Sequence, residues 1–144
     1  MVEEKFILLV EDNPDDVELT LRAFSKNRIL NRVIVVKDGA EALDFLFAAG
    51  DYADRDINIK PTVILLDLQL PKVHGLEVLK RIKSDKRLQL IPVVILTSSK
   101  EEFDMVQGYS LGANSFIRKP VDFLQFNEAV KNLGLYWVVL NETN

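Results

Sequence analysis

The segment VILLDLQLP, residues 63–71, places an aspartate directly after four apolar residues. An unbroken run of Val, Ile and Leu is typical of a parallel strand that is covered on both faces of its sheet. A bare carboxylate inside such a core is strongly unfavourable. We therefore expect Asp67 to lie at the end of a buried strand, where its negative charge serves the function of the protein.

Four other segments have the same strand character. Three of them are apolar runs like the first, and the last one is shorter and is expected at an edge of the sheet. Taken in chain order, the five predicted strands are residues 5–10, 32–36, 62–66, 92–97 and 114–120.

Helical patterns separate these strands. The first has Asn13 as a possible N-cap and Pro14 at its first helical position, the second has Gly50 as a plausible stop, and Asp122 can cap the fifth. The fourth pattern is the weakest. The apolar positions are Val17, Leu21 and Phe24, then Ala42, Leu43, Leu46 and Phe47, then Leu76, Leu79 and Ile82, then Phe103 and Val106, and finally Phe126, Val130 and Leu133.

Strict alternation of strand and helix implies right-handed crossovers and a parallel sheet. The sequence thus predicts an α/β fold with a doubly wound, flavodoxin-like sheet of five strands in the order 2-1-3-4-5 and with five helices. We expect one domain over residues 1–134, followed by an apolar extension over residues 135–144.

Composition narrows the function. The net charge of −4 argues against non-specific binding to nucleic acid or to an anionic membrane, and the absence of cysteine excludes disulfides and thiolate metal sites. The acidic start does not resemble a signal peptide, and no apolar run approaches the length of a membrane span. We expect a cytoplasmic protein.

Polar residues stand at the ends of four of the predicted strands, namely Glu11 and Asp12, Asp67, Thr97 and Lys119. Each of them alone would be an ordinary turn former, helix cap or solvated side chain. In open α/β sheets, however, ligands bind beyond the carboxyl ends of the strands, so these groups should converge on one rim.

The chemistry of that rim suggests phosphoryl transfer. Two carboxylates about 4 Å apart repel by roughly 4 kcal/mol at an effective dielectric of 20, so a cluster of three needs a cation. Oxygen ligands without His or Cys suit Mg²⁺. Together with a lysine and a hydroxyl, such a site can neutralise phosphoryl oxygens, and an aspartate can accept the group as an acyl phosphate.

Four motifs resemble the receiver domain of two-component response regulators: LLVEDNPDD (8–16), VILLDLQLPKVHGLEVL (63–79), VVILTSS (93–99) and SFIRKP (115–120). The resemblance implies that a sensor histidine kinase phosphorylates Asp67 and that the protein promotes its own phosphorylation and dephosphorylation, without being an enzyme on another substrate. It implies roles for six further residues: Asp12, the backbone carbonyl of Gln69 and, through water, Glu11 as Mg²⁺ ligands beside Asp67, Thr97 as a switch hydroxyl, Lys119 as the phosphate-binding cation and Phe116 as an aromatic that changes rotamer.

Two other functions share parts of this pattern. A flavodoxin-like electron carrier would need a loop after the first strand that can cradle the FMN phosphate, whereas that loop here is EDNPDD. A phosphatase with an aspartyl-phosphate intermediate would need a second acid where Gln69 stands. His74, the only histidine, could be a phosphate relay but is better explained as a solvated loop residue.

The insertion at 50–61 and the ending at 127–144 resemble the stand-alone regulators of phytochrome-type histidine kinases in cyanobacteria. Without a recognisable DNA-binding module, output is expected through contacts with other proteins. The apolar run at 135–140 can fold back on its own sheet or support a homodimer through the fourth helix, fifth strand and fifth helix. The homodimer is the expectation.

Overall fold

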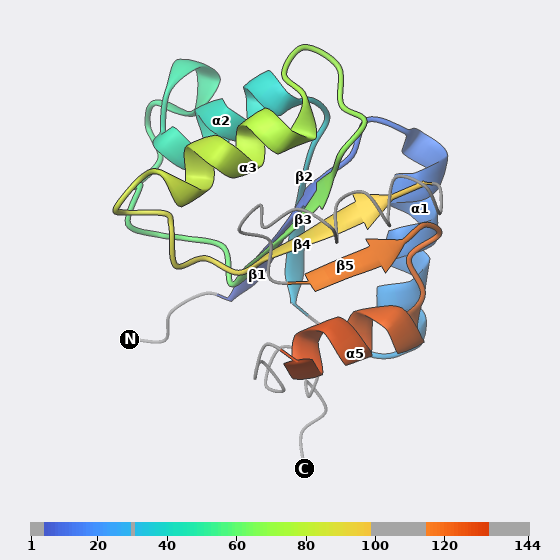
Figure 1. The fold of residues 1–144 in the computed structure, drawn as a ribbon. Coiled ribbons are helices and arrows are strands. Elements are labelled where there is room, and N and C mark those ends of the chain that lie inside the picture. The colour runs from blue at the N-terminus through green and yellow to red at the C-terminus, as the bar shows by residue number, and fades with distance from the viewer. Residues whose placement is uncertain (1–4, 30, 99–114, 133–144) are drawn as a thin grey trace.

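The computed structural model of the protein describes residues 5–29, 31–98 and 115–132 (Figure 1). Five parallel strands form one sheet in the order β2-β1-β3-β4-β5, as the sequence predicts. Their bounds are β1 Phe6–Val10, β2 Arg32–Val36, β3 Val63–Asp67, β4 Val93–Thr97 and β5 Ser115–Arg118. The short β5 lies at an edge, which confirms that expectation.

Four helices are described, α1 Pro14–Lys26, α2 Gly39–Phe47, α3 Gly75–Lys83 and α5 Phe123–Asn132. The side chain of Asn13 caps α1 by accepting from the N–H groups of Asp15 and Asp16, and Asp122 Oδ1 accepts from Gln125 N at the start of α5. The predicted fourth helix, with Phe103 and Val106, lies outside the described residues, as do Leu133 and the 135–144 extension.

The predicted stop of the second helix at Gly50 is wrong. α2 ends at Phe47, and Ala48 takes the left-handed conformation with φ 54°. Gly50 instead begins the short 3-10 helix η1 Gly50–Tyr52. The guanidinium of Arg55 donates to the carbonyl oxygen of Phe45 and stacks 3.8 Å from its ring centroid, so the insertion takes up a carbonyl at the end of α2.

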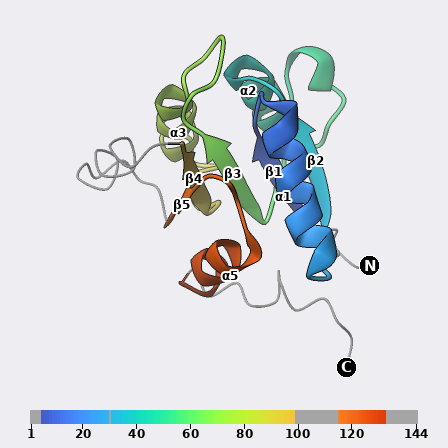
Figure 2. The same cartoon turned by 90° about the vertical axis from the view of Figure 1, so that its right-hand side faces the viewer.

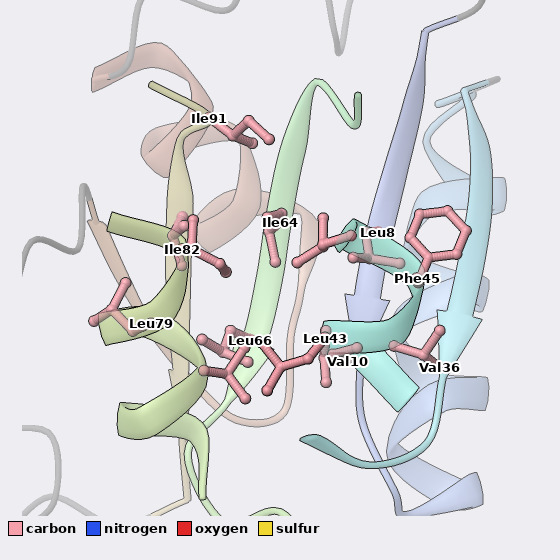
Figure 3. Close-up of a cluster of buried hydrophobic side chains, with 14 of the residues drawn as sticks. Leu8, Val10, Val36, Leu43, Phe45, Ile64, Leu66, Leu79, Ile82 and Ile91 are labelled. Atoms are coloured by element: carbon pink, nitrogen blue, oxygen red, sulfur yellow. The ribbon is translucent and has the colours of Figure 1, made fainter. Parts of the chain in front are cut away.

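Helices cover both faces of the sheet, α2 and α3 on one side and α1 and α5 on the other (Figure 2). Because side chains alternate along a strand, Leu8 and Val10 pack toward α2 and α3, whereas Ile7 and Leu9 pack toward α1 and α5. Figure 3 shows the hydrophobic core between the sheet and helices α2 and α3, with Leu43 and Phe45 of α2 against the sheet. Both faces are buried, which explains the unbroken apolar runs.

The strand register brings the polar strand ends together. Val10 pairs with Leu66, Asp67 with Leu96, and Thr97 with Arg118, so Glu11, Asp67, Thr97 and Lys119 follow one another across the same edge. Over the described ranges, none of the helices has both the length and the apolar character needed to span a bilayer.

Candidate functional site

Asp67 is the last residue of β3 and is 1% exposed. Both oxygens of its carboxylate are held: Oδ1 accepts from the backbone N–H of Gln69 at 3.1 Å, and Oδ2 accepts from Lys119 Nζ at 3.1 Å. Buried charges persist only where they are paired or hydrogen-bonded. The end of β3 therefore carries a buried carboxylate. Its position is fixed by Gln69 in the loop that follows the strand and by Lys119, which is far away in the sequence but in direct contact.

Glu11, Asp12 and Asp67 form an acidic cluster, with one carboxylate oxygen from each lying within 4.8 Å of the others. Glu11 follows β1 and is buried, whereas Asp12 is exposed. Burial, and then hydrogen bonding and repulsion with Asp67, raise the pKa of Glu11 to about 7. Bringing the carboxylates of Glu11 and Asp67 together is thus unfavourable, as the sequence suggests.

The ammonium of Lys119 offsets part of the repulsion between these carboxylates. Its Nζ lies 3.1 Å from Glu11 Oε1, 3.1 Å from Asp16 Oδ2 and 3.1 Å from Asp67 Oδ2. Burial of the ammonium opposes its charge, but the carboxylates outweigh burial, so the pKa of Lys119 lies above its ordinary value. The Lys119–Pro120 peptide bond is cis, and the backbone N–H of Lys119 donates to the carbonyl of Thr97 at 2.7 Å.

Asp16 is a member of this arrangement that the sequence reasoning missed. It occupies the third position of α1, where an acid is commonly a helix-capping residue. The sequence position therefore suggests a capping role and gives no indication of the contact with Lys119. The available signal was the second acidic pair in EDNPDD, Asp15 and Asp16, which begins four residues after Glu11.

Thr97, at the end of β4, is fully buried. Its Oγ1 makes no hydrogen bond, the one such buried side-chain atom found in the described ranges. A buried hydroxyl without a partner is energetically costly, so Thr97 Oγ1 is a hydrogen-bonding group whose capacity is unused in this structure.

Phe116, in β5, is half-buried and packs against the core on the α2 and α3 side. Gln69 is exposed and lies at the site through its backbone N–H. His74 is exposed and caps α3, because its Nδ1 accepts from the N–H of Leu76 at 3.1 Å. This capping role is sufficient to explain why a histidine stands at position 74.

The donor set fits a hard divalent cation. The acidic cluster of Glu11, Asp12 and Asp67 offers only oxygen donors. The ammonium of Lys119 contacts Glu11 and Asp67 of this cluster, and it also contacts Asp16 outside the cluster. Carboxylates without His or Cys suit Mg²⁺ or Mn²⁺. The excess of negative charge in this cluster attracts such an ion electrostatically.

Comparisons with known proteins agree with this geometry. Residues 7–131 match the response regulator receiver domain. The structure of the bacteriophytochrome response regulator AtBRR is similar, with a TM-score of 0.89 and 54% identity, covering 98% of this chain and 100% of AtBRR. The phosphorylated cyanobacterial phytochrome response regulator RcpA gives a TM-score of 0.74 and 40% identity, covering 97% of each chain.

Response regulator Rcp1 from Synechocystis sp. is 37% identical over 134 residues, which are 93% of this chain and 89% of Rcp1. Its Mn²⁺-bound crystal structure aligns with a TM-score of 0.73 at 36% identity, covering 96% of this chain and 97% of that one. Receiver domains bind Mg²⁺ or Mn²⁺ in an acidic pocket and obtain phosphoryl groups from histidine kinases. The chain belongs to the response regulator receiver domain family of two-component signalling, with phytochrome response regulators among its close structural neighbours.

Proposed function

We propose that this protein is a regulator that accepts a phosphoryl group on Asp67 from a sensor histidine kinase and signals through protein–protein contacts. The observation that carries the proposal is the setting of Asp67, a buried carboxylate at a strand end that shares Lys119 with Glu11 and Asp16. The family assignment favours neither the electron carrier nor the phosphatase, and the phosphatase lacks its second acid at Gln69.

The transfer itself needs little from the protein beyond position and charge. One carboxylate oxygen of Asp67 forms a bond to phosphorus while the bond from phosphorus to the donor imidazole nitrogen breaks, and the electron pair stays on the ring nitrogen. Lys119, already 3.1 Å from Asp67, balances the charge on the phosphoryl oxygens.

A divalent cation would be held by Asp12, Asp67 and the backbone carbonyl of Gln69, with Glu11 acting through water. Bound there, Mg²⁺ would supply the positive charge that offsets repulsion between the carboxylates and the incoming phosphoryl group. The fit of the all-oxygen cluster of Glu11, Asp12 and Asp67 supports this assignment.

The signal would travel through Thr97 and Phe116. The unpaired Oγ1 of Thr97 can donate to a phosphoryl oxygen, which draws the end of β4 toward Asp67. Phe116, half-buried on the neighbouring β5, would then turn inward and change the surface of that edge. Phosphate in this scheme biases two existing conformations of the protein.

The partner kinase is proposed to be of the phytochrome type, since AtBRR and RcpA are described as phytochrome response regulators.

We also propose a homodimer through the fourth helix, β5, α5 and the 135–144 extension. Light scattering on the full chain and on a chain that ends at Gly134 tests the dimer, which a full-length monomer at high micromolar concentration, phosphorylated or not, would contradict.

The phosphoacceptor is tested with a small phosphodonor and with purified histidine kinases, phytochrome-type kinases among them. Wild-type protein should gain one phosphoryl group by intact mass, and Asp67→Asn should gain none. Asp12→Asn, which removes an exposed carboxylate from the same cluster, should be labelled slowly but at Asp67. Equal labelling of wild type and Asp67→Asn, or labelling undiminished by a chelator, would contradict the assignment.

A further inference from the structure

Asp16 contacts Lys119 but belongs to neither the acidic cluster nor the set of residues assigned above. Its Oδ2 lies 3.1 Å from Lys119 Nζ, although the two residues are 103 positions apart in the chain. The contact joins the first turn of α1 to the end of β5.

Helix capping does not account for this carboxylate. An acid at the third helical position usually accepts from the backbone N–H of the N-cap residue. Here the N–H of Asn13 donates to Glu11 Oε2 at 3.2 Å, and Asn13 Oδ1 accepts from the N–H groups of Asp15 and Asp16. The start of α1 is capped without the Asp16 carboxylate, which reaches Lys119 instead.

The ammonium of Lys119 has only three N–H donors. Three carboxylates share them, those of Glu11, Asp16 and Asp67, each with an oxygen 3.1 Å from Nζ. A contact of Lys119 with phosphoryl oxygens beyond Asp67 therefore competes with these three acceptors for its N–H donors. Asp16 is the one that water can best compensate, because its side chain is 27% exposed, whereas those of Glu11 and Asp67 are 1% and 2% exposed.

We propose that Asp16 is a positioning residue that holds Lys119 toward α1 in the unphosphorylated protein and competes with the phosphoryl group for its ammonium. The inference rests on the proposed function, because it requires a phosphoryl group on Asp67. Asp16 thereby opposes the phosphorylated conformation, and its removal favours that conformation.

The test uses beryllium fluoride, a phosphoryl analogue, with saturating Mg²⁺ and full-length protein, and fluorine NMR to measure binding. Asp16→Asn should bind beryllium fluoride about threefold to tenfold more tightly than wild type, the range for a charged contact that is partly screened by solvent. Asp16→Glu, which keeps the carboxylate, should stay within about twofold of wild type. Asp15→Asn is the matched control, since it removes the same charge from an exposed side chain in the same helical turn.

Unchanged or weaker binding by Asp16→Asn would overturn the inference, as would an equal gain in Asp15→Asn, which would reveal a general effect of net charge. If wild type does not bind beryllium fluoride, the proposed function falls, and this inference falls with it. If Asp16→Asn does not fold, wild type alone decides: the carboxyl carbon resonance of Asp16 should shift on binding while that of Asp15 does not. A static Asp16 resonance would overturn the inference.

Discussion

Gly75 packs so closely against the backbone around Asp67 that a side-chain carbon at position 75 would overlap the carbonyl oxygen of Asp67 and lie 2.7 Å from Leu68 Cα. The N–H of Gly75 also donates to the carbonyl of Leu68 at 3.1 Å. The first residue of α3 is thus pinned to the segment that carries the candidate phosphoacceptor, which explains a glycine eight residues after that aspartate.

Gly75→Ala is expected to lower the free energy of unfolding by about 1–3 kcal/mol, because the added methyl group must displace backbone rather than a flexible side chain. The displaced segment carries Asp67, so labelling by a phosphodonor should slow as well. Urea unfolding and intact mass measure the two effects. Lys80→Ala, on the exposed face of α3, should change stability by less than about 0.5 kcal/mol. A Gly75→Ala protein that matches this control would contradict the proposed close packing.

Thr97→Val is expected to have opposite effects on the two states of the protein. It removes a buried hydroxyl that has no partner, so the unphosphorylated protein should be as stable as wild type or more stable by about 1 kcal/mol. Binding of beryllium fluoride should weaken, because the hydroxyl is then missing as a donor. Thr97→Ser should keep most of the binding. A loss of stability in Thr97→Val without any loss of binding would show that the hydroxyl is structural.

The position of the site could be predicted from sequence because it depends on strand ends. Unbroken apolar runs fix where each parallel strand stops, and Asp67 and Thr97 are the final residues of β3 and β4. Once the sheet is parallel, these residues must share one edge. Lys119 follows β5 by the same argument.

The rest depends on tertiary contacts that local patterns do not contain. The partner of Asp16 depends on how α1 lies relative to the end of β5, and the acidic pair of Asp15 and Asp16 does not by itself identify that partner. The end of α2 was mispredicted because glycine is the usual left-handed residue there, whereas Ala48 takes that conformation. Arg55 of the insertion donates to the carbonyl of Phe45 at this helix end, a contact that the local pattern does not predict.

Glu11 should make the stability of the metal-free protein depend on pH. Its pKa rises from 4.5 to about 7 on folding, so the folded protein binds the proton more tightly. The resulting stabilisation is fully present below pH 4.5, is lost as the pH rises through about 7, and is constant above that. The total change is at most about 3 kcal/mol.

Urea unfolding of the metal-free protein between about pH 5 and 8 measures this dependence. Glu11→Gln removes the titrating group while keeping a hydrogen-bonding side chain of similar size, so its stability should change less over this range. The difference between the two curves isolates Glu11 from the other acids. Parallel curves for wild type and Glu11→Gln would contradict the raised pKa.

Mg²⁺ should stabilise the wild-type protein and should do so through Asp12. An ion that binds only the folded state adds RT ln(1 + [L]/Kd), about 1.4 kcal/mol at a concentration of about ten times Kd. Asp12 is exposed but has a carboxylate oxygen within 4.8 Å of those of Glu11 and Asp67, so Asp12→Asn should fold normally and lose most of the added stability. Thermal unfolding with and without Mg²⁺ measures the gain, and a chelator should reverse it.

Asp15→Asn is again the matched control for Asp12→Asn, because it removes an exposed carboxylate from the same segment without touching the acidic cluster. It should keep the full stabilisation by Mg²⁺. Loss of one ligand charge also raises Kd, so a high concentration of Mg²⁺ should partly restore the stability of Asp12→Asn. If Asp12→Asn gains as much stability as wild type at every Mg²⁺ concentration, the ion binds elsewhere, and the excess negative charge around Lys119 must be balanced by another means.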